Sequence, residues 1–179
     1  MTEQQDRGYL VVVVGMLAGP GPAAEVYRLS KKQPSRFHFI VPATKPDYGW
    51  TWSEEQALAD ARERLEIMLE FGSAMGLEVS GDVTRNDDPV DAARAAADGF
   101  DEIIVIDNPR GLRHWRSDKA LAQLAADPGL PLHHFRADPP LSQGKHFDTS
   151  ELRGHFQRFL QDLKRSETDL HFDAPSRER

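Results

Sequence analysis

Cysteine is absent from the 179-residue chain, which excludes disulfides, thiol nucleophiles and thiolate metal sites. A long apolar run is also missing. The longest, residues 9–18, is far shorter than the roughly 20 residues that a membrane-spanning helix needs. The first eight residues are polar and lack the apolar segment of a secretory signal. These absences predict a soluble, cytoplasmic protein with no membrane partner.

An excess of positive charge is lacking as well. The chain has 22 Lys and Arg against 29 Asp and Glu, with a formal net charge of −7 at pH 7. This balance argues against nucleic acid as a partner, because nucleic-acid binding relies on basic surfaces. The chain is 39% hydrophobic and 28% charged, a globular composition, and its length predicts a single domain with short additions.

Apolar segments that alternate with helical patterns predict a five-stranded parallel sheet. The strongest are residues 9–14 (YLVVVV) and 101–107 (DEIIVID), which are typical of strands buried on both faces. The other strands are expected at residues 36–43, 77–83 and 132–137. Right-handed crossovers place helices on both faces of such a sheet, so the fold class is α/β, three-layered and Rossmann-like.

Helix signals complete this prediction. Ser53 and Gln56 form a capping box before a long helix that ends at Gly72 or Gly76. Asp88 followed by proline is a second strong start signal. The expected core positions of the long helix are Leu58, Ala61, Leu65, Met68 and Leu69.

The chain divides into a main domain and a C-terminal addition. We expect a flexible N-terminus at residues 1–8, the α/β domain at 9–137 and a linker at 138–147. An amphipathic helix is expected at 148–165, since apolar residues recur at helical spacing there. Residues 166–179 are charged and aperiodic, which predicts a disordered tail.

The stretch VTRNDDPVDAARAAADGFDEIIVIDNPRG, residues 83–111, resembles the universal stress protein family. In that family a GD-x-x-x-A-I-x-x-x-A helix precedes a D-x-I-V-(I/V)-G strand. The resemblance covers residues 9–137. It implies an adenine nucleotide alpha hydrolase-like fold with strand order 3-2-1-4-5, a stress-response role and homodimers. In many members it also implies ATP or AMP bound across the crevice of the sheet.

The chain departs from the nucleotide-binding pattern of that family. Those members place an Asp at the end of the first strand, where residues 14–16 read Val-Gly-Met. Their G-x2-G-x9-G-(S/T) loop, counted from Gly111, would require glycines at His114 and Leu124. Val41, at a position whose backbone would face adenine, fits the pattern. The chain therefore resembles degenerate members of the family, and no cofactor is expected unless ATP or AMP binds.

Two irregular segments, residues 15–22 and 108–117, follow the first and fourth strands, between which this topology forms its ligand crevice. Glycines, a helix N-terminus and arginines there would suit a small anionic ligand. The candidate binding residues are Gly15, Gly19, Gly21, Val41, Asn108, Arg110, Gly111, Arg113, Arg116 and Ser117. Ordinary solvated loops explain the same residues, so both readings stay open.

Other polar residues point to no catalytic or metal site. His133 and His134 are adjacent on a strand, so they face opposite sides of the sheet and cannot share a metal. Capping explains Asp88 and its neighbours. Asp107, at the carboxyl end of a strand, has the position of a functional acid but no partner base or nucleophile in the sequence.

Three further features bear on ligands and partners. Tyr48, Trp50 and Trp52 either cover the crevice or pack on the long helix. The C-terminal helix and the strand at 132–137 are both candidates for a dimer interface.

The leading prediction is a non-catalytic universal-stress-like protein, a homodimeric regulatory or interaction module with a degenerate nucleotide site. The alternative is a binder of an adenine nucleotide or other phosphorylated ligand between strands 1 and 4. A hydrolase acting through Asp107 is a third hypothesis.

Overall fold

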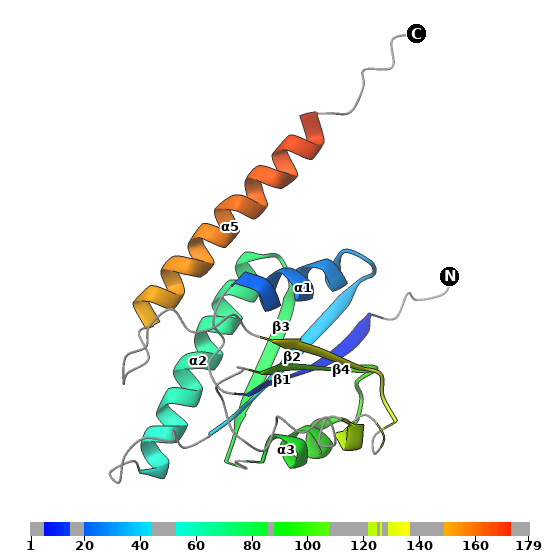
Figure 1. The fold of residues 1–179 in the computed structure, drawn as a ribbon, viewed down its shortest axis with the longest axis vertical. Helices are drawn as coiled ribbons and strands as arrows, with labels where there is room; N and C mark the ends of the chain where they lie inside the picture. Colours follow the sequence, from blue (N-terminus) through cyan, green and yellow to red (C-terminus); the bar gives the residue numbers. More distant parts are fainter. Residues whose placement is uncertain are drawn as a thin grey trace.

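A five-stranded parallel sheet forms the centre of the molecule in this computed structural model (Figure 1). The structure describes residues 6–14, 20–43, 53–85, 88–107, 122–124, 126, 129–136 and 149–172. The strands are β1 (Arg7–Val14), β2 (Ser35–Pro42), β3 (Glu78–Thr84), β4 (Glu102–Asp107) and β5 (Leu132–Arg136). All neighbours are parallel and the order is β3-β2-β1-β4-β5. The predicted fold class and strand order are confirmed.

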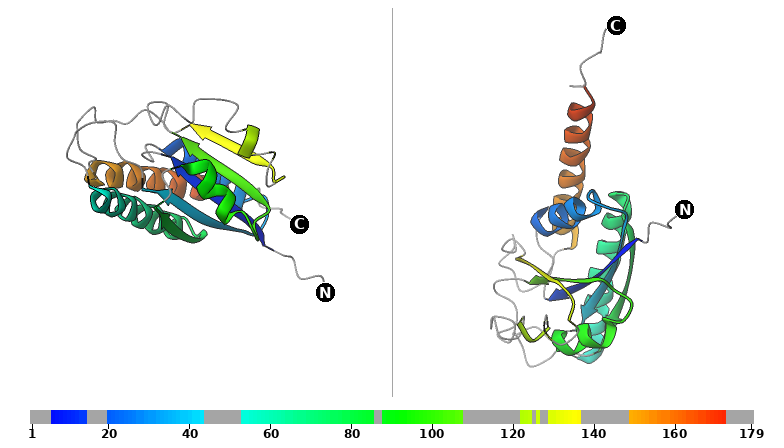
Figure 2. Two further views of the ribbon diagram at one scale, coloured as in Figure 1. Left: turned by 90° about the horizontal axis from the view of Figure 1, so that it is seen from below. Right: turned by 90° about the vertical axis from the view of Figure 1, so that its right-hand side faces the viewer.

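Helices lie on both faces of the sheet (Figures 1 and 2). One face is covered by α1 (Pro20–Ser30) and α2 (Glu54–Ala74), and α5 (Thr149–Phe172) packs against these two helices. The opposite face packs against α3 (Pro89–Ala96) and Leu124. This division follows from right-handed crossovers, because the connections run outward from β1 to β3 and then back across the sheet to β4.

The side chains of β1 alternate between two hydrophobic layers. Tyr9, Val11 and Val13 face α1 and α2, whereas Leu10 and Val12 face α3. All five are at most 3% exposed. Burial on both faces explains why this strand is a continuous apolar run with no polar alternation.

The local helix signals act as predicted. The Ser53 hydroxyl accepts a hydrogen bond from the Gln56 backbone amide, and the Gln56 side-chain oxygen accepts one from the Ser53 backbone amide. The long helix ends before Gly76, which has a φ of +75°, so this glycine and not Gly72 is the stop signal. Among the described residues, no helix is both long and apolar enough to cross a membrane.

The buried side of α2 is confirmed at Leu58, Ala61 and Met68 but differs from the prediction at two positions. Leu65 and Leu69 are only half-buried, whereas Arg64, Ile67 and Phe71 are buried. Leu65 lies over Gly81 of the edge strand β3, where the sheet ends and leaves one side open to water. Position relative to the sheet edge therefore decides which apolar residues of α2 enter the core.

Two predicted boundaries are corrected. The segment from Pro20 to Pro22 is helical rather than irregular, because prolines are compatible with a first helical turn. The C-terminal helix continues past residue 165 to Phe172, so residues 166–172 do not belong to a disordered tail. The i,i+3 pair of Arg165 with Asp162 supports the turn that leads into this extension, and Glu167 and Leu170 within it are good helix formers. Residues 1–5, 137–148 and 173–179 lie outside the described part.

Candidate functional site

The carboxyl ends of β1 and β4 lie side by side. Their register runs from Tyr9–Glu102 to Val14–Asp107, the last residues of both strands. The connections that leave these ends run in opposite directions, because β2 and β5 lie on opposite sides of the β1–β4 pair. This is the switch point at which open α/β sheets bind ligands.

Most of the predicted ligand-binding residues lie outside the described residues. These are Gly15, Gly19, Asn108, Arg110, Gly111, Arg113, Arg116 and Ser117, together with the aromatic residues Tyr48, Trp50 and Trp52. The backbone of Asp107 is described but its side chain is not. What the structure places is therefore the pair of strand ends from which the two loops depart.

Gly21 and Val41 are described, and neither offers a side chain to a ligand. Gly21 is exposed in the first turn of α1. The Val41 side chain is fully buried, so only its backbone could meet a bound molecule. That backbone pairs with Val83 of β3, whereas the pairing of β2 with β1 extends only to Ile40. Val41 thus lies just beyond the last β1–β2 pair.

The described helix N-termini at the carboxyl end of the sheet are poorly suited to phosphate. In α1, Pro20 and Pro22 have no amide hydrogen to donate. The amides at the start of α2 lie next to Ser53 and the acidic Glu54 and Glu55. Free amides and the helix dipole make an anion site only where the helix's own side chains do not already occupy them.

The N-terminus of α3 is capped in the same way. The Asp88 carboxylate accepts hydrogen bonds from the backbone amides of Val90 at 2.8 Å and Asp91 at 3.4 Å. This confirms the predicted capping role of Asp88. Anion binding at the switch point would therefore depend on residues 108–117 rather than on α1, α2 or α3.

Arg64 is a buried cation that the sequence pattern did not reveal. It is 8% exposed, and its guanidinium donates to the Pro42 carbonyl at 3.3 Å and the Asp60 carbonyl at 3.4 Å. Burial lowers the pKa of Arg64, and the nearby Asp60 carboxylate partly offsets this effect. The sequence signal that could have revealed this burial is the position of Arg64 on the apolar stripe of α2. Arg64 brings positive charge to the carboxyl end of β2.

A polar cluster lies at the opposite, amino end of the sheet. Glu102 is 7% exposed and accepts hydrogen bonds from Arg7 of β1 and His133 of β5. Nearby, the Asp101 carboxylate accepts the Gly8 amide at 2.7 Å. The cluster ties three strands together far from the switch point, which favours a structural role.

The two adjacent histidines of β5 face opposite sides of the sheet, as predicted. His133 pairs in register with Ile104 and His134 with Val105, and these partners belong to the two different hydrophobic layers. One metal ion therefore cannot bind both side chains from this strand.

His38, Ser80 and Asp82 form a second cluster that the sequence reading missed. The His38 Nδ1 atom lies 2.8 Å from Ser80 Oγ, and its Nε2 atom lies 3.4 Å from Asp82 Oδ2. The types match a catalytic triad, but Asp82 is 77% exposed, so water screens its charge. The cluster is best explained as cross-strand pairing between β2 and β3. Only their register, with His38 opposite Ser80, brings these residues together.

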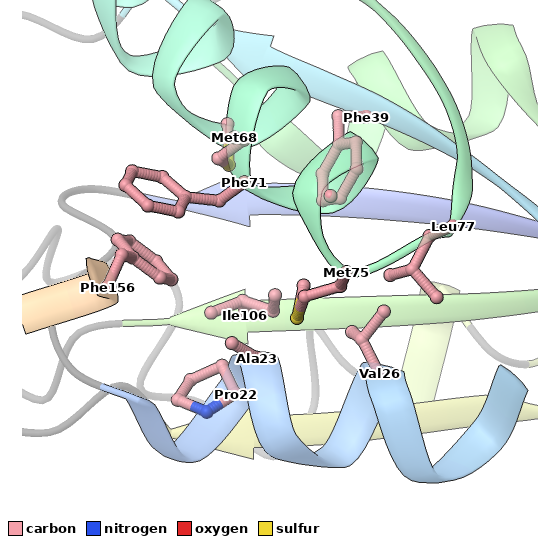
Figure 3. A pocket seen from close by; sticks show the side chains of 11 residues that line it. Pro22, Ala23, Val26, Phe39, Met68, Phe71, Met75, Leu77, Ile106 and Phe156 are labelled. Atoms are coloured by element: carbon pink, nitrogen blue, oxygen red, sulfur yellow. The ribbon is translucent and has the colours of Figure 1, made fainter. Parts of the chain in front are cut away.

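An apolar pocket lies between α1, α2 and α5 (Figure 3). Its cavity volume is about 30 Å³. The lining residues are Pro22, Ala23, Val26, Phe39, Met68, Phe71, Gly72, Met75, Leu77, Ile106 and Phe156. Polar chemistry is lacking in this lining, so the pocket suits an apolar side chain or ligand rather than a reaction.

Within the described part of the chain, no three His, Asp or Glu residues are grouped so that they could hold a metal ion. Comparison with known proteins adds no assignment: no protein-family model and no curated protein matches this chain.

Proposed function

We propose that this chain is a non-catalytic, universal-stress-like protein that acts as a homodimeric regulatory or interaction module with a degenerate nucleotide site. The observation that carries the proposal is the pairing of Val14 with Asp107. It brings the starts of the two predicted ligand loops together at the carboxyl ends of the two central strands of a 3-2-1-4-5 sheet. The cytoplasmic location expected from the sequence stays a prediction.

The degenerate character is supported by how the edge of the sheet is built. Prolines remove amides from α1, and side chains of the chain itself cap α2 and α3. A phosphate bound there would have few free amides and would face acidic first turns.

The alternative is a site that binds an adenine nucleotide or another phosphorylated ligand between β1 and β4. The run of arginines at 110, 113 and 116 favours it, because this run begins just after the end of β4. Guanidinium groups bind phosphate through paired hydrogen bonds. Arg64 adds positive charge near the end of β2.

Thermal unfolding in the presence of ATP, AMP and cyclic nucleotides distinguishes the two. A ligand that binds the native state raises the Tm by mass action, so the leading proposal expects no shift and the alternative expects a rise. For the alternative, Arg113→Ala with Arg116→Ala abolishes the rise. The matched control, Arg165→Ala on the exposed side of α5, keeps it. A nucleotide-induced rise in the unaltered chain would refute the degenerate site.

The homodimer is tested separately by size-exclusion chromatography with light scattering. We expect twice the mass of one chain, independent of added nucleotide. A strictly monomeric mass at micromolar concentration contradicts this part of the proposal.

A further inference from the structure

The C-terminal helix α5 is held by one deep aromatic anchor. Phe156 is 3% exposed, and its ring stacks on Phe71 of α2 with centroids 4.5 Å apart and planes 21° from parallel. Figure 3 shows this ring entering the apolar pocket from α5, opposite the α2 side chains and near Ile106. The groove between α1 and α2 is therefore a binding site for an apolar residue of a helix.

The spacing of apolar residues on α5 matches this type of binding. Phe156, Phe159, Leu160 and Leu163 stand at positions i, i+3, i+4 and i+7. Phe159 and Leu160 pack against the same hydrophobic layer, partly buried. An amphipathic helix that binds a groove in another protein uses this same set of anchors. Here the groove and the helix belong to one chain.

A polar pair of described residues lies at the rim of the groove. Arg153 of α5 donates a charge-assisted hydrogen bond to Glu70 of α2, and both side chains are substantially exposed. This pair gives the groove a charge complementary to the helix that binds it. The charges of this pair can also be reversed by substitution without changing the apolar interior of the groove.

The helix is separable from the rest of the molecule. Its main contacts with other described elements are with α1 and α2, and beyond them it projects away from the domain (Figures 1 and 2). It follows residues 137–148, which could span up to about 40 Å if fully extended. The groove holds some unfilled space, and Met68 and Met75 in its lining can adjust to a rebinding helix.

We infer that the α1–α2 groove is a docking site for the α5 helix of a second copy, so that two chains exchange their C-terminal helices. A second copy fits because an exchanged helix repeats in the partner every contact that it makes at home, including the pair of Arg153 with Glu70. Exchange of identical elements is a low-cost route to a dimer for this reason. The inference rests on the homodimer part of the proposed function and assigns its interface.

Charge reversal tests the exchange. Arg153→Glu and Glu70→Arg are made in separate chains. Each variant places like charges at positions 70 and 153, both within one chain and in a dimer of two identical chains. When the two variants are mixed, each α5 finds an opposite charge only in the groove of the other variant. The chain carrying both changes is the matched control, since it restores opposite charges and behaves as the parent.

We expect the mixture to form more heterodimer than random mixing gives, as measured by native mass spectrometry at low ionic strength. The excess disappears at high salt, because exposed ion pairs are weak and screened. Random mixing at low salt, or mixing that is insensitive to salt, overturns the exchange.

A second pair of variants tests the anchor. Phe156→Ala should lower the Tm but leave the dimer dissociation constant within about threefold of the parent value, because the closed monomer and the exchanged dimer lose the same ring contact. The neighbouring exposed Gln157→Ala should change neither quantity. A dimer weakened at least about tenfold by Phe156→Ala overturns the exchange but leaves the homodimer intact, because its contacts would then differ from those within one chain. A parent chain that is monomeric overturns both.

Discussion

Tyr9 shows how one residue can couple stability to pH. Its ring stacks on Phe37 with centroids 5.0 Å apart, and it lies beside the polar cluster of Glu102 and His133. Burial raises the pKa of the Tyr9 phenol above its ordinary 10.0, the hydrogen bond with Gln33 opposes this, and the Glu102 carboxylate adds to it. The folded protein therefore holds this proton more tightly than the unfolded chain does.

The stability that Tyr9 contributes is consequently complete below about pH 10 and is lost as the pH rises through its folded-state pKa. We expect Tyr9→Phe to be about 1 kcal/mol less stable than the parent near neutral pH, because it loses the hydrogen bond with Gln33. The gap should narrow above about pH 10, as urea unfolding at a series of pH values would show. Tyr27→Phe controls for removing a phenol elsewhere. A gap that stays constant to high pH contradicts this account.

Arg64 marks a limit of residue-level prediction. Helical spacing alone places it on the same side of α2 as Ala61 and Met68, but residue type argues for an exposed side chain. The structure buries it because carbonyls of Asp60 and Pro42 lie within reach of its guanidinium. Those acceptors come from different elements, so only their packing could reveal the outcome.

At the scale of elements, the contact between α2 and β3 depends on a glycine. A Cβ atom at Gly72 would lie 2.6 Å from Cγ1 of Val79, closer than packed atoms allow. Glycine inside a helix normally costs stability, yet here it lets the helix approach the edge strand. Gly154 of α5 offers the contrast, because no neighbouring atom lies within 4 Å of a Cβ built there.

Alanine at these two positions should therefore act in opposite directions. We expect Gly72→Ala to lower the free energy of unfolding by about 1–3 kcal/mol through overpacking against Val79. Gly154→Ala should leave it unchanged or raise it by up to about 1 kcal/mol through better helix propensity. Urea denaturation of both variants measures this. A shift of the same sign and size would show that helix propensity, not close packing, governs both sites.

At the scale of the whole molecule, stability is concentrated in the middle of the sheet. Leu10, Val11 and Val12 of β1 and Ile103 and Ile104 of β4 are completely buried. The edge strands β3 and β5 consist of half-buried and exposed side chains where these are described. Cooperative opening should begin where least apolar surface is buried.

Native-state hydrogen exchange should reproduce this order. We expect amides of β1 and β4 to exchange slowest, and those of β3, β5 and α5 at least about tenfold faster. Peptide-resolved mass spectrometry is the measurement. Equal protection of α5 and β1 would mean that α5 opens only with the whole domain, and it would contradict the separability of the helix.

The sequence alone determined the class of the fold, the succession of strands and helices, and the capped starts at Ser53 and Asp88. These properties are local: a β-branched run, a helical period or a cap depends on residues close along the chain. The strand order came from the family resemblance, and it predicted where a ligand crevice should lie. For the binding side chains themselves, most positions fall outside the described residues.

Tertiary structure decided which distant residues meet. The pairing of Val14 with Asp107, the contact of His38 with Ser80 and the stacking of Phe156 on Phe71 depend on strand register and on how helices cross the sheet. Register and crossing are settled by the combined burial of many side chains from separate elements. No short stretch of sequence includes all the side chains that take part in this burial. These contacts therefore became known only from the folded structure.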